Sequence, residues 1–166
     1  LRHSAQTLLA PQEYDLKDFI IPVAEDAKGS FAESVQIFQG LVFIFDGQIE
    51  TAKKHFQSLL DKTDNAMSQT LSQLYLLHIA LLEGDHEKAE QYACNRGVKS
   101  FLSLKMADTQ IMQAWYQFLV KKDMDQTDKA IKIARQNMGT SRLVRDEKRY
   151  YESWLAELEK KIAEGV

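Results

Sequence analysis

The sequence predicts an all-α protein built from stacked helical hairpins. Two segments support this prediction, each with an apolar run at helical spacing, then a glycine, then a second amphipathic run with an alanine five residues after the glycine. The two glycines, Gly47 and Gly84, lie 37 positions apart, and so do the two alanines, Ala52 and Ala89. A fixed period of this size is typical of helical-repeat proteins.

The composition fits a single compact body. The 166 residues are 45% apolar and 27% charged, and two prolines and seven glycines leave little room for linkers. A net charge of −3 argues against general electrostatic binding of nucleic acid or of an anionic membrane. Because Cys94 is the only cysteine, an internal disulfide and a cysteine zinc site are excluded, and a reducing, cytoplasmic location is expected.

The N-terminal segment, 1–29, is expected to pack on the first hairpin. A short helix is expected over 2–10, ended by a proline. For the apolar residues 14–23 two interpretations stay open, a helix over 15–21 or an extended apolar connector. The chain begins with Leu1, which suggests a piece of a longer protein or a processed product. No stretch reaches the ~20 apolar residues that a membrane span needs, and no signal peptide is visible.

The first hairpin is expected over 30–63. Ser30 is expected to cap its first helix, with Glu33 three residues later completing a capping box. The apolar spacing continues to the break at Gly47, and a second helix is expected over 48–60.

The second hairpin is expected over 64–97. Asp64 is expected to cap a long apolar helix that ends at Gly84, in the left-handed conformation that glycine adopts at helix ends. Asp85 is expected to cap the return helix, which should end near Gly97.

The third hairpin, 98–141, follows the pattern more loosely. No glycine occupies its turn, so the side chain of Asp125 or Thr127 is expected to cap the return helix. A charged helix with an apolar stripe is then expected over 142–163, within a C-terminal capping region of 142–166 that covers the last open face.

The first hairpin resembles the tetratricopeptide repeat (TPR). In that family a small residue lies where the two helices cross, an aromatic follows three positions later, and alanine and aromatic residues mark the second helix. Close approach of the helices explains small residues on a bulky apolar face. The second hairpin departs in part, and the third keeps little beyond Ala130. The matching positions of the first hairpin are Gly40, Phe43, Gly47, Ala52, Phe56 and Leu59; the second keeps Gly84, Asp85 and Ala89 but has Leu77, Ala80 and Ala93 elsewhere.

The resemblance implies a right-handed superhelix, an α-solenoid, of about three TPR-like hairpins over 30–141. The period exceeds the usual spacing of the family, as in the longer-helix repeats found beside receiver or DNA-binding domains in bacterial regulatory proteins. A non-repetitive helical bundle is the alternative fold.

Residues that could support catalysis are scattered. The histidines, His3, His55, His78 and His86, lack the spacing of a metal site. His55 and His86 are expected to face solvent, and His78 to line a packed or groove face. Cys94 is expected to be a buried, inert thiol, since no histidine partner is implied. We therefore expect no enzyme activity, no metal and no cofactor.

The resemblance also implies a binding surface. In a TPR stack the first helix of each hairpin lines a groove, and the apolar groove expected here suits an amphipathic helix or an apolar peptide. Two alternatives stay open, in which these positions are filled by residues 14–23 or simply pack in the core. The expected groove residues are Ile37, Leu41, Phe45, Leu71, Leu74, His78, Leu81, Met112 and Tyr116.

Together these observations predict a non-catalytic protein–protein interaction module, and the resemblance implies that it is the regulatory domain of a larger bacterial signalling or transcription-regulatory protein. A stand-alone TPR-type chaperone for a secreted or assembly partner is the alternative. The expected partner is a protein or peptide, and a homodimer stays open. A basic cluster in the last helix could instead contact an acidic partner or nucleic acid, but interleaved acids favour a solvated face. That cluster comprises Arg142, Arg145, Lys148 and Arg149.

Overall fold

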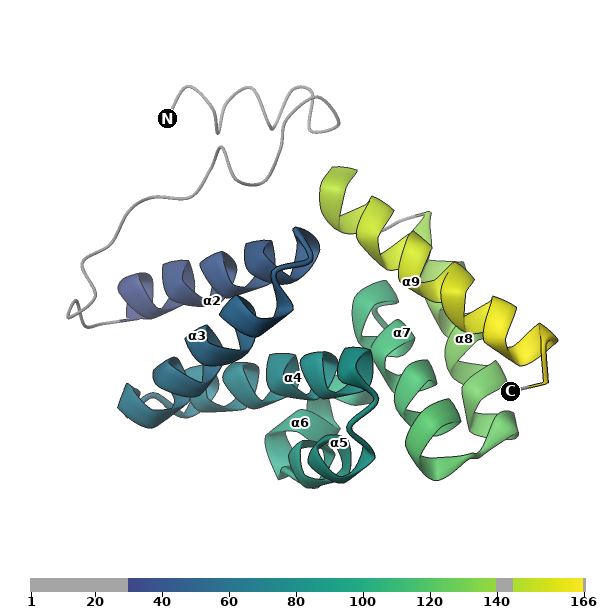
Figure 1. The fold of residues 1–166 in the computed structure, drawn as a ribbon, viewed down its shortest axis with the longest axis horizontal. Coiled ribbons are helices and arrows are strands. Elements are labelled where there is room, and N and C mark those ends of the chain that lie inside the picture. Colours follow the sequence, from purple (N-terminus) through teal and green to yellow (C-terminus); the bar gives the residue numbers. More distant parts are fainter. Residues whose placement is uncertain (1–29, 140–144, 166) are drawn as a thin grey trace.

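The structure is a computed structural model that describes residues 30–139 and 145–165. Its regular structure in these ranges is entirely helical, without a strand, which confirms the predicted all-α class (Figure 1). The predictions for 2–10 and 14–23 lie outside the described residues. The helices are α2 (Ser30–Phe45), α3 (Ile49–Lys62), α4 (Ala66–Glu83), α5 (His86–Ala93), α6 (Arg96–Leu102), α7 (Ala107–Tyr116), the π-helical turn η3 (Gln117–Lys121), α8 (Met124–Met138) and α9 (Arg145–Ala163).

Helices that follow one another in the chain pack side by side. The pairs α2 with α3, α4 with α5, and α7 with α8 are in contact, and α4 also packs on α3, α6 and α7. Helix α4 contributes buried residues to both apolar clusters of the molecule, Leu76 and Ile79 to one and Leu74 and Leu77 to the other. It is therefore the central helix of the fold.

Both glycine turns have a left-handed backbone, which was predicted for Gly84. Gly47 has φ +78° and Gly84 has φ +70°, both in the left-handed region that favours glycine. Asp85 caps α5, as predicted, because its carboxylate accepts a hydrogen bond from the Lys88 N–H at 3.1 Å. In the third turn Lys122 takes the left-handed position, with φ +54°.

Two predicted caps are wrong by one or a few residues. Asn65, and not Asp64, caps α4, and Asp123 caps α8 in place of Asp125 or Thr127. In both cases the capping residue stands directly before the helix with an extended backbone. Its side chain therefore reaches the N–H three residues on, which the predicted residues do not.

Glu33, which was predicted to complete a capping box at Ser30, makes hydrogen bonds to residues outside its own helix. Ser30 is already the first residue of the helix, and Glu33 binds the connection between α3 and α4. The Glu33 carboxylate accepts hydrogen bonds from Thr63 Oγ1 at 2.5 Å and from Ser68 Oγ at 2.9 Å. Thr63 and Ser68 are buried, so this network ties the first turn of α2 to the start of α4.

Helix α5 ends earlier than the predicted Gly97. It stops at Ala93, and Asn95 caps a separate short helix, α6, by accepting a hydrogen bond from the Val98 N–H at 3.1 Å. Gly97 lies in the first turn of α6, where a Cβ would lie 2.6 Å from Thr70 Oγ1 of α4. Glycine is needed there for a close helix contact and not for a turn.

The close helix crossing predicted for the first hairpin is confirmed. A Cβ on Gly40 would lie 2.3 Å from Cζ of Phe56, whose ring fills that space. The positions 37 residues later are Leu77 and Ala93, both buried in one apolar cluster. In the first hairpin the small residue lies on the first helix and the large one on the second, whereas in the second hairpin the order is reversed. Each hairpin therefore has one large and one small residue at these two positions.

Candidate functional site

Most of the residues expected to line a groove pack inside the molecule. Six of the nine have at most 7% of their surface exposed, and the other three are half-buried against the same apolar clusters. This arrangement agrees with the core interpretation that the sequence leaves open. The six are Ile37, Leu74, His78, Leu81, Met112 and Tyr116, and the three are Leu41, Phe45 and Leu71.

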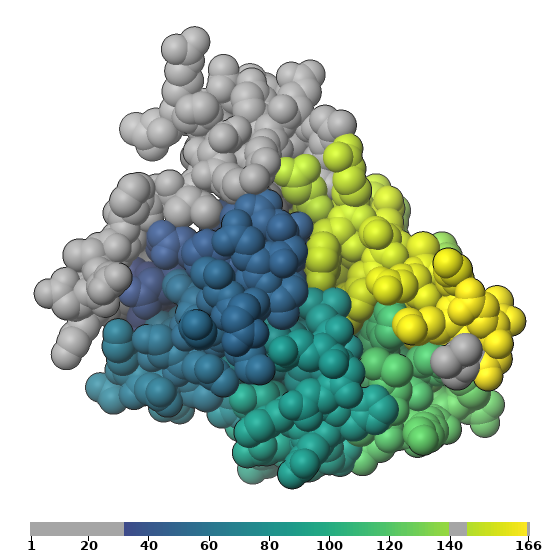
Figure 2. All heavy atoms as spheres, in the orientation of Figure 1, coloured from purple at the N-terminus to yellow at the C-terminus, as the bar shows by residue number. Residues whose placement is uncertain are grey.

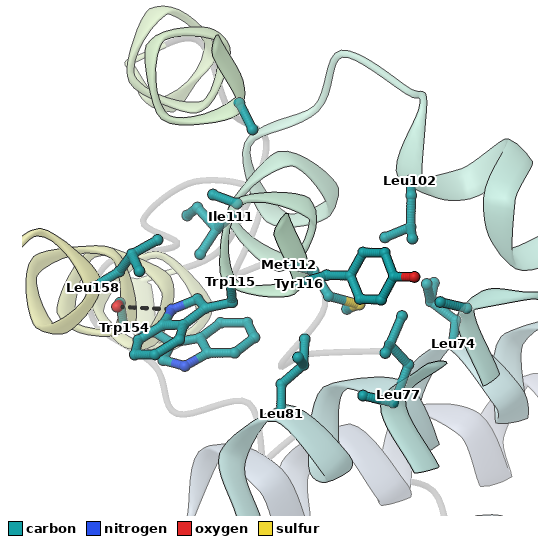
Figure 3. Packing of buried hydrophobic residues seen from close by; sticks show 14 of the residues in the cluster. Leu74, Leu77, Leu81, Leu102, Ile111, Met112, Trp115, Tyr116, Trp154 and Leu158 are labelled. Carbon is teal, nitrogen blue, oxygen red and sulfur yellow. Dashed lines mark hydrogen bonds between the residues drawn. The ribbon is translucent and has the colours of Figure 1, made fainter. Parts of the chain in front are cut away.

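Tyr116 points to the second hairpin. Its hydroxyl donates a hydrogen bond to Glu90 Oε2 at 2.9 Å, and Lys121 Nζ lies 2.7 Å from Glu90 Oε1. The hydrogen bonds from Lys121 and Tyr116 lower the pKa of Glu90. The neighbouring Trp115 points the opposite way, towards α9 (Figure 3). Sequence reasoning missed Trp115, because the looser third repeat left the register of its first helix poorly defined.

Helix α9 covers a surface to which the first helices of all three hairpins contribute. One residue from each of these helices makes ring contacts with α9, and we call these three residues the inner face. Helix α9 therefore reaches back to the first hairpin, and Figure 2 shows its yellow-green atoms beside the blue atoms of that hairpin. The inner face is Phe45 of α2, His78 of α4 and Trp115 of α7, and the α9 residues on it are Tyr150, Tyr151 and Trp154.

His78 is at the centre of this contact. Its imidazole stacks on the Trp154 ring, with centroids 4.1 Å apart and an interplanar angle of 2°. Its Nε2 shares a hydrogen bond of 2.8 Å with the Tyr150 hydroxyl, while its Nδ1 is buried without a hydrogen-bond partner among the described residues. Complete burial lowers the pKa of His78 to about 3, so the imidazole is neutral at pH 7.

The two ends of the inner face hold α9 by other contacts. The Trp115 indole N–H donates a hydrogen bond of 3.1 Å to the backbone oxygen of Trp154, drawn as a dashed line in Figure 3, and the two rings stack at 5.6 Å. The ring of Phe45 lies 5.0 Å from that of Tyr150 and 5.9 Å from that of Tyr151. Three helices are thus joined to α9 through aromatic contacts.

A hollow of about 370 Å³ lies between the end of α2 and the first half of α9. We call it the α2–α9 pocket. Its apolar surface comes from a buried valine and from half-buried Phe45 and Tyr150, and its rim is polar. The pocket can therefore accept an apolar side chain whose neighbours are polar. Its lining residues are Val42, Phe45, Asp46, Asp146, Arg149, Tyr150 and Ser153.

Two carboxylates affect each other near the start of α9. Burial raises the pKa of Glu147 to about 7, and the charge of Asp108 at the start of α7 adds to this increase. Burial likewise raises the pKa of Asp108. When the first turn of α9 packs in place at neutral pH, the carboxyl groups of Glu147 and Asp108 come close together, and the negative charge of one disfavours ionisation of the other.

Three further expectations are tested by exposure. Cys94 is exposed, with Sγ 3.8 Å from Glu90 Oε1, so the prediction of a buried thiol is wrong. His86 is exposed, as predicted, but His55 is half-buried and its Nε2 lies 2.5 Å from the backbone oxygen of Gln36. Tyr151, two residues after Arg149 of the basic cluster, is 2% exposed and lies in the interior.

Within the described ranges, no three histidine, cysteine or acidic side chains are grouped so that they could hold a metal ion. The helices of the same part of the chain all fall short of the length and apolarity that crossing a bilayer requires. Comparison with protein-family models, with curated proteins and with solved structures found no match to this chain.

Proposed function

We propose that this chain is a non-catalytic protein-interaction module of TPR-like hairpins, the regulatory domain of a larger bacterial signalling or transcription-regulatory protein. The observation that supports this most is the seating of an amphipathic helix, α9, across the first helices of three hairpins. A surface that holds a helix within the chain has the chemistry to hold one from a partner. The 37-residue period and the Gly40–Phe56 crossing support the TPR-like part.

The α2–α9 pocket is the proposed entry point for a partner. Among the described residues it is present while α9 is in place, and it combines apolar surface from Phe45 and Tyr150 with a polar rim. An apolar anchor buried in such a hollow typically contributes much of the binding energy of an interface. The proposed partner is an amphipathic helix or an apolar segment.

Among the described residues, His78 has the largest lowering of its pKa, and its surroundings favour a structural role over a catalytic one. His78 is fully buried beneath Trp154 and is neutral, so it has no access to a substrate. Catalytic bases need to lie within hydrogen-bond reach of the proton that they remove. We therefore propose no reaction for this site.

The test is affinity capture from a lysate with three forms of the chain: wild type, Ser153→Trp and Glu152→Trp. Both positions are exposed on α9, but only Ser153 lines the α2–α9 pocket. The tryptophan at 153 should fill the pocket and reduce capture of the partner at least tenfold, while the tryptophan at 152 should leave capture unchanged.

Circular dichroism first establishes that the three forms are equally folded. Equal capture by all three would move the binding surface away from the pocket. If none of the three forms captures any protein while circular dichroism shows that they are folded, the interaction-module proposal is contradicted.

A further inference from the structure

Helix α9 is held at its centre by two side chains that meet a single imidazole. Tyr150 and Trp154 lie four residues apart, one helical turn, so both project from the same side of α9. The Tyr150 hydroxyl is 2.8 Å from His78 Nε2, and the Trp154 ring stacks on the same imidazole at 4.1 Å. The His78 imidazole therefore contacts both a hydroxyl and a flat ring, which lie one helical turn apart on α9.

The contact that holds α9 is confined to one stripe of the helix. The buried residues of α9 are Tyr151, Trp154, Leu155 and Leu158, whereas positions such as Glu152 and Ser153 are exposed. Helix α9 is also the last helix of the described part, and the helices beneath it pack on one another through α4. Removing α9 therefore breaks none of the other helix pairs.

Two unfavourable features accompany the seating of α9. His78 Nδ1 is buried and has no hydrogen-bond partner in the described part of the chain, and a polar atom in this state costs free energy that hydrogen bonds to water would otherwise compensate. Glu147 at the start of α9 is half-buried near Asp108, so two carboxyl groups are brought together. Both features favour release of α9 and are offset by the aromatic contacts.

We propose that α9 is a displaceable intramolecular ligand, and that the inner face binds in its place a partner helix with tyrosine and tryptophan four residues apart. His78 is the residue that selects this pair. The inference rests on the proposed function, because it names the partner class for the same module. A partner with phenylalanine in place of the tyrosine leaves both nitrogens of a buried imidazole unpaired, so it is disfavoured.

The test is binding of a fluorescent peptide with the sequence of residues 145–163 to the full chain, followed by anisotropy. In the wild-type chain the attached α9 competes at high effective concentration. The Trp154→Ala chain has a weakened α9, so it should bind the wild-type peptide at least tenfold more tightly than the wild-type chain does. If circular dichroism shows that this variant is unfolded, the Tyr150→Phe chain, which loses only a hydroxyl, replaces it.

Peptide variants test the selection by His78. A Tyr150→Phe peptide should bind several-fold more weakly than the wild-type peptide, a Trp154→Ala peptide at least tenfold more weakly, and a Glu152→Ala peptide, altered at an exposed position, equally well. On a chain that also carries His78→Phe, the Tyr150→Phe peptide should lose its disadvantage, because the hydrogen-bond partner is gone.

Equal peptide affinity for the wild-type and weakened chains, no measurable binding, or no discrimination against the Tyr150→Phe peptide would overturn the proposal. The experiment uses no external partner. If the peptide experiment fails, the result of the capture experiment at the α2–α9 pocket is not affected. If the peptide binds but no partner is captured, only the proposed function is contradicted.

Discussion

Gly40 lies where α2 crosses α3, and the ring of Phe56 occupies the space that a Cβ at this position would need. The nearest ring atom would be 2.3 Å from that Cβ, and the ring belongs to a residue with no exposed surface. Phe56 therefore has little freedom to move aside, and interiors at this packing density tolerate added atoms poorly.

Gly40→Ala should lower the free energy of unfolding by about 1–3 kcal/mol, the usual cost of overpacking, although alanine favours helix by up to ~1 kcal/mol. Urea denaturation measures the change. The control is Gly139→Ala, since Gly139 has φ −69° and nothing within 4 Å of a Cβ. This control should be neutral or slightly stabilising. Equal effects at the two positions would show that the crossing is not tight.

His78 and Glu147 give stability opposite dependences on pH. The pKa of His78 is about 3 in the folded chain against 6.5 unfolded, so stability falls as pH decreases from 6.5 to 3, where only the unfolded chain gains the proton. The pKa of Glu147 is about 7 folded against 4.5 unfolded, so stability falls as pH rises from 4.5 to 7, where the unfolded chain loses the proton first.

Glu147→Gln should remove only the second dependence. Between pH 4.5 and 7 the free energy of unfolding of the variant should rise relative to the wild type by about 1–3 kcal/mol, the lower values allowing for partial solvent screening. Denaturation curves at several pH values provide the measurement. Glu152→Gln, at an exposed position on the same helix, should follow the wild type. If the Glu147→Gln curve stays parallel to that of the wild type, the Glu147 carboxyl does not gain a proton on folding.

At the scale of elements, the third hairpin turn differs from the first two because Lys122 holds a left-handed conformation. Gly47 and Gly84 adopt that conformation without steric cost, whereas a residue with a Cβ is disfavoured there by about 1 kcal/mol. The turn is thus less stable than its two counterparts.

Lys122→Gly should raise the free energy of unfolding by about 0.5–1 kcal/mol, measured by thermal or chemical denaturation. Lys121→Gly is the matched control. It should be destabilising, because Lys121 is helical and its ammonium pairs with Glu90. A loss of stability in both variants would show that Lys122 makes a contribution that the turn geometry does not explain.

Glu33 joins the first hairpin to the second through Thr63 and Ser68. Glu33→Ala leaves two buried hydroxyl groups without this acceptor and should cost about 1–3 kcal/mol. Glu50→Ala, in the exposed first turn of α3, should change stability by less than about 0.5 kcal/mol. Thermal unfolding distinguishes the two, and equal midpoints would mean that the network contributes nothing measurable.

Helices and glycine turns could be predicted from the sequence because they depend on local periodicity and on backbone freedom. The break between α5 and α6 could not, because Gly97 suggested a helix end and its real role depends on Thr70, which is distant in the sequence. The cap at Asp123 was missed for a related reason: several turn residues could cap a helix, and only the backbone decides among them.

At the scale of the whole molecule, the position of α9 could not be predicted from its own pattern. An apolar stripe predicts that a helix packs against other helices, and Tyr150 and Trp154 lie on that stripe, next to the buried Tyr151. That the stripe reaches Phe45 of the first hairpin depends on contacts more than a hundred residues apart in the chain. For the same reason the sequence could not decide between an open groove and core packing for the expected groove residues, most of which are buried.

The central claim is that the inner face is a helix-binding surface and that α9 is its exchangeable occupant. Amide hydrogen exchange of the intact chain at neutral pH tests it most directly. We expect α9 to exchange as one unit at least tenfold faster than α4 and α7, because it opens while the helices beneath it stay packed. Protection of α9 equal to that of α4 would mean that α9 opens only when the whole protein unfolds, and would contradict the claim.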